Sequence, residues 1–300
     1  MLYQLGRAYD AAKDYAKARD FYARAAELGH ALAANNLGAL YDNGRGMAED
    51  LVAARRFYEQ AARDGVALAM SNLGWMYQHG RGGTQDYEAA HAWYEKAAAA
   101  GFALGALRAG WLHYYGKGVT KDPVAARRWY EKAAEGGNAE AMREIGFLYE
   151  RGEGVAIDYA KARSWYEKAA GGGDGLAMSN LGVIYARALG VAQDYVMARQ
   201  WYERSAAIGA PAGMLNLGGI FERGEGVPVN YDAARAWFEK AAAKDFAPAM
   251  ISLGFLYEHA RGVPRDGAEA RRWYEKAAQQ GDERGAKELA RLQKISETKN

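Results

Sequence analysis

The chain has 300 residues, 50% of them hydrophobic, so it can bury a sizeable core without a disulfide framework. Its net charge is only +2 and the charges are spread along the whole length, which argues against nucleic acid or a strongly acidic molecule as the partner. There is no cysteine, which excludes disulfides, thiolate metal sites and cysteine nucleophiles, and no apolar run approaches the roughly 20 residues of a membrane-spanning helix.

One pattern recurs eight times at intervals of 36 residues, and its most visible part is an aromatic pair. The pairs are Phe21-Tyr22, Phe57-Tyr58, Trp93-Tyr94, Trp129-Tyr130, Trp165-Tyr166, Trp201-Tyr202, Trp237-Phe238 and Trp273-Tyr274. An alanine stands three positions before each pair. A fixed period of roughly 20 to 50 residues is typical of repeat architectures, so we expect an array of similar units.

Each period predicts two helices. The first carries a Leu-Gly pair followed by a tyrosine, as in Leu73-Gly74 and Tyr77, and one unit departs from this with Ala109-Gly110 and His113. The second places Ala90, Trp93, Tyr94 and Ala97 at i, i+3, i+4 and i+7, which is one apolar stripe at helical spacing. The fold class predicted is therefore all-α.

The ends of the second helices can be predicted in chain order from capping residues. Each begins after a residue whose side chain can accept from the first-turn amides, namely Asp14, Asp50, Asp86, Asp122, Asp158, Asp194, Asn230 and Asp266. Each ends at a residue suited to a left-handed conformation, namely Gly29, Gly65, Gly101, Gly137, Gly173, Gly209 and Gly281, with Asp245 as the exception. A Gly-x-Gly sequence between the helices, as in residues 44–46, predicts a tight turn.

The two ends of the chain differ. Residues 282–295 are strongly charged, with Leu289, Leu292 and Ile295 as a narrow apolar stripe, which predicts a C-terminal capping helix. We expect residues 1–295 to form a single solenoid and residues 296–300 a polar tail. Met1 leads directly into apolar residues without a polar cap, so we expect the chain to be the C-terminal part of a longer protein, which leaves the cellular compartment open.

The order alanine, Leu-Gly, tyrosine, Gly-x-Gly, aspartate, alanine, Trp-Tyr, Ala-Ala and glycine resembles the Sel-one-like repeat (SLR), a branch of the tetratricopeptide-like (TPR-like) helical solenoids. The resemblance covers essentially residues 1–290. It implies a right-handed superhelical solenoid of about eight helix-turn-helix repeats whose first helices line a concave groove. It also implies a role as an adaptor or scaffold that holds other proteins, although a fold does not by itself determine a function.

Signatures of catalysis or of a cofactor are not found in the sequence. The Gly-x-Gly sequences follow helices and lack the third glycine of a dinucleotide fingerprint, and neither a P-loop nor a zinc-protease motif occurs. We expect no cofactor, no metal site and no enzymatic activity. A hydrolase acting on peptidoglycan or β-lactams, as claimed for some relatives, is a minor alternative because a nucleophile with an acid–base pair is missing.

The candidate binding residues lie next to the Leu-Gly pair, where the resemblance places the groove and where residue types vary between units. They are Asn36, Asn72, Trp75, Arg108, Trp111, Phe147, Asn180 and Asn216, and Tyr114, Tyr115 and Arg143 lie near them on the same predicted helices. The asparagines resemble those with which some TPR grooves hold a peptide backbone or terminal carboxylate; alternatively, they bond the backbone of a neighbouring helix. Aromatic rings rimmed by arginine are the composition of an interface anchor; alternatively, these rings fill the seam between helices.

The function predicted is a non-catalytic scaffold that binds a peptide or protein in its groove, centred on units two to four. We predict neither nucleic-acid binding nor membrane insertion. The main alternative is an architectural spacer or oligomerisation arm, which would self-associate and tolerate substitutions in the groove.

Overall fold

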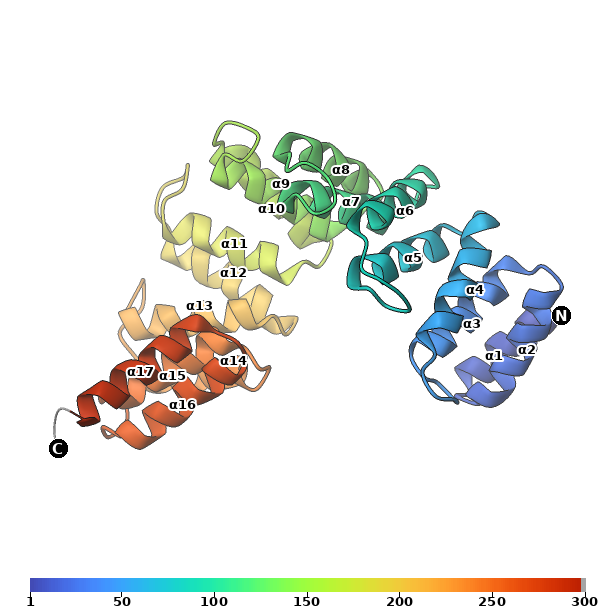
Figure 1. Ribbon diagram of the computed structural model, residues 1–300. Coiled ribbons are helices and arrows are strands. Elements are labelled where there is room, and N and C mark those ends of the chain that lie inside the picture. Colours follow the sequence, from blue (N-terminus) through green and yellow to red (C-terminus); the bar gives the residue numbers. More distant parts are fainter. Residues whose placement is uncertain (298–300) are drawn as a thin grey trace. The chain divides into compact units, whose positions relative to one another are not determined.

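The structure, a computed structural model, describes residues 1–297, and side chains as far as residue 294. This part contains 17 helices and no strand (Figure 1), which confirms the all-α prediction. The helices are α1 (Leu2–Ala11), α2 (Tyr15–Glu27), α3 (Ala31–Asp42), α4 (Leu51–Arg63), α5 (Ala67–His79), α6 (Tyr87–Ala99), α7 (Ala103–Tyr115), α8 (Pro123–Glu135), α9 (Ala139–Arg151), α10 (Tyr159–Gly171), α11 (Gly175–Ala186), α12 (Tyr195–Ala207), α13 (Pro211–Arg223), α14 (Tyr231–Ala242), α15 (Ala247–Glu258), α16 (Gly267–Gln279) and α17 (Glu283–Glu297).

The chain forms two compact units, Met1–Ile157 and Asp158–Asn300. Within each unit a helix packs chiefly against the helices that precede and follow it in the sequence, so contacts are local along the chain. First helices of neighbouring repeats are also in contact. In the first unit α5 contacts α7, and in the second unit α11 contacts α13. The assignment of residues 1–295 to one solenoid stays a prediction.

The predicted caps are present at all eight second helices. Each predicted aspartate or asparagine accepts a hydrogen bond from a first-turn backbone N–H, and Asp122 accepts two, with Pro123 as the first helical residue. The predicted glycines after these helices have φ between 80° and 87°, and Asp245 adopts the same left-handed region with a φ of 57°. The helix boundaries are therefore set by local side-chain and backbone chemistry.

The core is built from the second residue of each aromatic pair, packed on the glycine of the Leu-Gly pair. Tyr94 is fully buried, and a Cβ placed on Gly74 would lie 2.6 Å from its ring. The first residue of the pair behaves differently, since Trp93 is half-buried and Lys96 Nζ lies 4.0 Å from its ring centroid. The two aromatic residues of a pair therefore differ: the second fills the core and the first lies at its edge.

The turn between the helices also joins neighbouring repeats. The second glycine of a Gly-x-Gly sequence has a positive φ and lies against the start of the preceding second helix: a Cβ on Gly82 would lie 2.3 Å from the Leu51 carbonyl oxygen. A side chain at this position would separate the loop from the preceding repeat. The tight-turn prediction is confirmed, and the contact between repeats adds a second reason for glycine.

The C-terminal helix α17 packs on α16 and also contacts α15. Gly285 allows the close approach, because a Cβ there would lie 2.7 Å from the Ala277 methyl group. The side chain of Ile295 and residues 298–300 of the predicted tail lie outside the described part. Throughout the described helices, none combines the length and apolar character needed to cross a bilayer.

Removing one whole period tests the array character of the fold. We expect a chain lacking residues 253–288 to stay folded, because residue 289 then takes the register of residue 253 and most contacts involve adjacent units. Circular dichroism is expected to show a loss of roughly one repeat's share of the helical signal. Complete loss of the helical signal would contradict the array model.

Candidate functional site

All eleven predicted site residues lie on first helices of the helix pairs. In the first unit, α3 carries Asn36, α5 carries Asn72 and Trp75, α7 carries Arg108, Trp111, Tyr114 and Tyr115, and α9 carries Arg143 and Phe147. In the second unit, α11 carries Asn180 and α13 carries Asn216. The site is therefore described chiefly in the first unit, where α7 supplies most of its residues.

The predicted aromatic residues form two groups in the first unit. On α7 the ring of Trp111 lies 4.7 Å from that of Tyr115, which is 4.8 Å from Tyr114, and Tyr114 reaches Phe147 of α9 at 6.3 Å. Trp75 instead packs on His79 at 4.6 Å, with the Arg81 guanidinium 5.1 Å from its ring. Trp111 and Phe147 are thus connected through the rings of Tyr115 and Tyr114. Among the described residues, no ring contact connects Trp75 to Trp111.

Two of the three predicted rings on α7 are exposed, and the third, Tyr114, is half-buried. Trp111 exposes 37% of its surface and Tyr115 exposes 53%, whereas Trp75 and Phe147 are half-buried. Burial raises the pKa of the Tyr114 hydroxyl, and the nearby Glu153 carboxylate raises it further. Tyr114 therefore stays a neutral hydrogen-bonding group at physiological pH.

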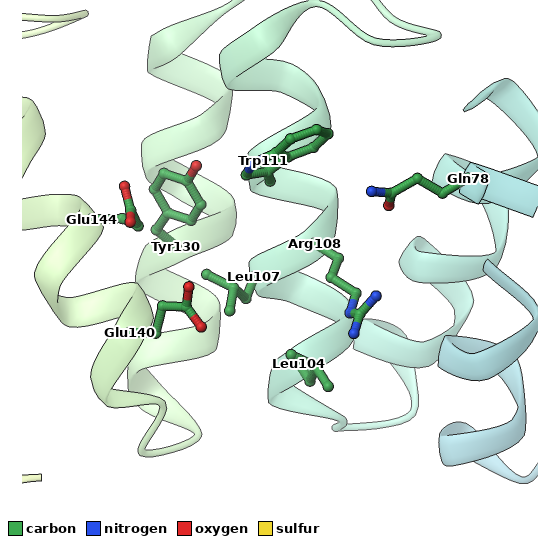
Figure 2. A pocket seen from close by; sticks show the side chains of 8 residues that line it. All are labelled: Gln78, Leu104, Leu107, Arg108, Trp111, Tyr130, Glu140 and Glu144. Atoms are coloured by element: carbon green, nitrogen blue, oxygen red, sulfur yellow. The ribbon is translucent and has the colours of Figure 1, made fainter. Parts of the chain in front are cut away.

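A pocket of about 210 Å³ opens beside Trp111. Its lining residues are Gln78, Leu104, Leu107, Arg108, Trp111, Tyr130, Glu140 and Glu144. Figure 2 shows that Arg108 points to the side of Gln78 and α5, whereas the two carboxylates come from α9 on the opposite side. Leu107, Trp111 and Tyr130 lie between them. The pocket therefore has one cationic wall, one acidic wall and an apolar floor.

The two arginines at this site have different electrostatic surroundings. Arg143 is 2.6 Å from the Glu144 carboxylate and 3.3 Å from that of Glu140, so it offsets the charge of the acidic wall. Arg108 donates from Nη1 to the Tyr94 hydroxyl at 3.3 Å, and its Nε is buried without a partner. Among the described residues no carboxylate lies within ion-pairing distance of Arg108. It is a cation with unused hydrogen-bonding capacity.

The asparagines bond between repeats. Asn72 Nδ2 donates to Oδ1 of the buried Asn35 at 3.3 Å, and Asn216 Nδ2 donates to Oγ of the buried Ser179 at 2.8 Å. The two bonds are the same contact repeated in the two units, because both pairs are 37 residues apart. The partner is a side chain one repeat earlier, not the backbone that the sequence suggested.

The other two asparagines are placed differently. Asn36 Oδ1 accepts from Asn35 Nδ2 at 3.1 Å, which links it to the same inter-repeat network, and Asn180 is half-buried on α11. The polar residue just before the groove asparagine, Asn35 or Ser179, was missed from the sequence because it is buried. Its signal was a polar residue at a position where three other repeats carry the apolar residues Leu107, Leu215 and Ile251, although Ser71 and Arg143 also occupy this position.

Six of the eight lining residues of the pocket were missed: Leu107, Tyr130 and Glu144, and, within one helical turn of a predicted position, Gln78, Leu104 and Glu140. Leu104 lies four residues before Arg108, as does Glu140 before Glu144, so both occupy the same helix face one turn earlier. Gln78 stands at a position occupied by Asp, Tyr, Glu or Ala in other repeats. Extending the search for variable positions by one turn in each direction would have found the latter three.

A pocket of about 480 Å³ in the second unit occupies equivalent positions four repeats later. Six positions match, namely Gln78 and Glu222, Leu107 and Ile251, Arg108 and Ser252, Trp111 and Phe255, Tyr130 and Tyr274, and Glu144 and Glu288. Its cation is Arg291, which pairs with Glu258 at 2.6 Å and Glu288 at 2.7 Å. The hydrogen bond from Arg291 lowers the pKa of Glu258. This arginine, unlike Arg108, is already neutralised.

With the fold and pockets described, known proteins can be compared with the chain. The Sel1 repeat model matches residues 1–30, 31–66, 67–102, 103–138, 139–174, 175–209, 211–246 and 247–282. Comparison with curated proteins gives no match.

Among solved structures, the chain is similar to c5321, a protective antigen of uropathogenic Escherichia coli with an SLR fold. The two are 35% identical with a TM-score of 0.74, over 97% of this chain and 63% of that one, so the chain spans less than two thirds of that protein. It is also 33% identical to a Sel1 repeat protein from Oxalobacter formigenes, with a TM-score of 0.74, over 80% of this chain and 98% of that one. Yeast Tom70 shares the fold alone, at 13% identity and a TM-score of 0.56, over 94% of this chain and 61% of that one.

Proteins with this repeat and with the related TPR fold typically act as protein-interaction scaffolds, and the fold is generally non-catalytic. The expectation that the repeats are of the Sel-one-like type is confirmed. Because eight consecutive matches span nearly all of its length, the chain belongs to the Sel1 repeat family.

Proposed function

We propose that this chain is a non-catalytic scaffold that binds a peptide or protein on the first-helix face of its first unit, with the pocket beside Trp111 as the centre of affinity. The observation that carries the proposal is the state of Arg108. Its guanidinium lies in a pocket wall beside a tryptophan that exposes 37% of its surface, and among the described residues no carboxylate pairs with it. A partner carboxylate can therefore form charge-assisted hydrogen bonds with this cation without competing with an ion pair of the chain itself.

The pocket favours a partner of definite chemistry. A carboxylate of the partner can accept charge-assisted hydrogen bonds from Arg108, and an adjoining apolar side chain can pack on Leu107 and Trp111. Repulsion from Glu140 and Glu144 is reduced because Arg143 pairs with both. The segment bound is therefore expected to be an acidic residue next to an apolar or aromatic one.

Binding is favoured over catalysis by the pocket lining. It contains no serine, threonine, cysteine or histidine, and both of its carboxylates, Glu140 and Glu144, pair with Arg143, which makes them weak bases and nucleophiles. The architectural alternative makes no use of an unpaired arginine beside an exposed ring. It predicts instead that groove substitutions have no effect and that the chain associates with itself at micromolar concentration.

Partner capture followed by affinity measurement tests the proposal. The partner is identified by pull-down from the source cell and mass spectrometry, then purified and titrated calorimetrically against the wild type, Trp111→Ala and Arg108→Ala. We expect each substitution to cost about 2 kcal/mol or more of binding free energy, roughly a 30-fold loss of affinity.

Matched controls come from the second helices of the same unit. Trp93→Ala on α6 and Arg128→Ala on α8 remove the same residue types away from the pocket and are expected to change the affinity less than about twofold. If the α7 variants bind as tightly as these controls, the pocket is not the binding site. If sedimentation also shows self-association, the architectural alternative is favoured.

A further inference from the structure

Two residues that depart from the repeat pattern are neighbours in the structure. Seven of the eight second helices carry arginine one position after the alanine of the repeat, as at Arg55, and the third carries His91 instead. The first helices carry tyrosine or phenylalanine four positions after the Leu-Gly leucine, as at Tyr77, and the fourth carries His113.

The two exceptional residues are contact partners. In the preceding repeat, the Arg55 guanidinium lies 3.9 Å from the ring centroid of Tyr77, a cation–π contact between α4 and α5. His91 of α6 and His113 of α7 occupy the equivalent positions, and their Nε2 atoms are 3.0 Å apart. Their rings meet edge to face, with centroids 4.8 Å apart. A histidine pair thus replaces the arginine–tyrosine contact of the preceding repeat.

The pair lies in a largely apolar environment. His91 exposes 13% of its side chain, and Trp129 of α8 meets its ring edge to face at 6.4 Å. The Nδ1 atom of His113 is buried without a partner. The uncharged Tyr77 of α5 packs against the core cluster of Ala90, Tyr94, Ala109 and Leu112, which includes the sequence neighbours of both histidines. Among the described residues, the carboxylate paired with His91 is that of Glu95 on α6, 3.6 Å from His91 Nδ1.

A 3.0 Å contact between two Nε2 atoms requires one proton between them: one ring donates its N–H and the other accepts. When both rings are protonated, two donors and two positive charges face each other. Burial lowers the pKa of His91, Glu95 opposes this, and His113 lowers it further. An arginine–tyrosine contact does not titrate in this range.

We propose that the contact between α6 and α7 is a pH-sensitive joint, held by the His91–His113 hydrogen bond at neutral pH and weakened when both rings carry a proton. The ordinary pKa of histidine is 6.5, and that of folded His91 lies below it, so the unfolded chain binds more protons in the interval between the two. The stabilisation is therefore present above about pH 6.5 and is lost as the pH falls through the folded pKa.

Two neighbouring observations bear on this assignment. Within the described part of the chain, no third histidine, aspartate, glutamate or cysteine is placed to complete a metal site. Helix α7 also carries Arg108 and Trp111, so loosening of the joint would reach the pocket. That consequence rests on the proposed function, whereas the joint itself does not.

The test introduces at positions 91 and 113 the arginine–tyrosine contact that Arg55 and Tyr77 form in the preceding repeat. The variant His91→Arg with His113→Tyr and the wild type are unfolded with urea at pH 7.5 and at pH 5.5. Between these pH values we expect the folding equilibrium constant of the wild type to fall at least about threefold more than that of the double variant. The control His259→Asn removes an exposed histidine from the second unit and is expected to keep the wild-type response. Equal responses of the wild type and the double variant would overturn the proposal.

A second measurement needs no variant. In a histidine-ring NMR titration of the wild-type chain, we expect the His91 resonance to titrate below pH 6.5 and to respond to the protonation of His113. Titration of His91 at or above pH 6.5 without a response to His113 would overturn the proposal even if the double variant fails to fold. Because neither measurement involves a binding partner, failure of the joint and failure of the groove are distinguishable.

Discussion

Tyr130→Ala is expected to lower the free energy of unfolding by about 3 to 5 kcal/mol, whereas Trp111→Ala lowers it by about 1 kcal/mol or less. Tyr130 exposes 1% of its surface, and a Cβ on Gly110 would lie 2.6 Å from its ring, so its removal leaves a cavity between α7 and α8. Trp111 directly follows Gly110, which places it about 100° around the helix from that glycine, and it exposes 37% of its surface.

Urea unfolding of the two variants beside the wild type measures the difference. Trp129→Ala, at the half-buried first position of the same aromatic pair, is expected to fall between them. Comparable losses for Trp111 and Tyr130 would place Trp111 in the core and remove the argument for an exposed anchor. A small loss for Tyr130 would instead contradict the assignment of the core to the second aromatic residue.

Gly182→Ala is expected to destabilise the chain by about 1 to 3 kcal/mol. The added Cβ would lie 2.3 Å from Cε1 of Tyr202, which exposes only 4% of its surface and cannot turn away. Alanine has the higher helix propensity, worth up to about 1 kcal/mol, but the steric term opposes it and is larger. Thermal unfolding with the heat of unfolding measured by calorimetry gives the net effect.

The matched control is Gly171→Ala in the same unit. Gly171 is the last residue of α10, has no left-handed φ, and a Cβ there would meet no atom within 4 Å. We expect this substitution to be neutral or to stabilise by up to about 1 kcal/mol through helix propensity alone. Opposite signs for the two variants support packing as the reason for the glycine. A stabilising Gly182→Ala would show that the ring can move aside.

The pocket illustrates a limit on what the sequence can predict. Arg108 and Trp111 were identified because residue types vary at the positions next to the Leu-Gly pair, which is Ala109-Gly110 in this repeat. Gln78 and Glu140, however, are 62 residues apart in the chain and line one pocket only after α5, α7 and α9 pack together. The unpaired state of Arg108 also depends on distances to side chains of other helices. The residue types predicted an aromatic anchor with arginines beside it. Only the packing shows that Arg143 is paired with carboxylates, whereas Arg108 has no carboxylate partner among the described residues.

The histidine pair shows the same limit. Both residues could be recognised as departures from the repeat, yet nothing in the spacing of 22 residues shows that they touch. The Arg55–Tyr77 contact in the preceding repeat makes the pairing evident. Such a contact between successive helices can be predicted from the sequence of one repeat only when the structure of an equivalent repeat shows it.

The sequence by itself determined the all-α class, the 36-residue period, the capped starts of the second helices and their glycine ends, including the exception at Asp245. These features depend on hydrogen bonds and backbone conformations within a few residues, so the information is local. Only the tertiary structure decided that the second aromatic residue of each pair is buried while the first lies at the edge, because both occupy the same helical stripe. It also decided which variable side chains contact one another, because these contacts join different helices of the array.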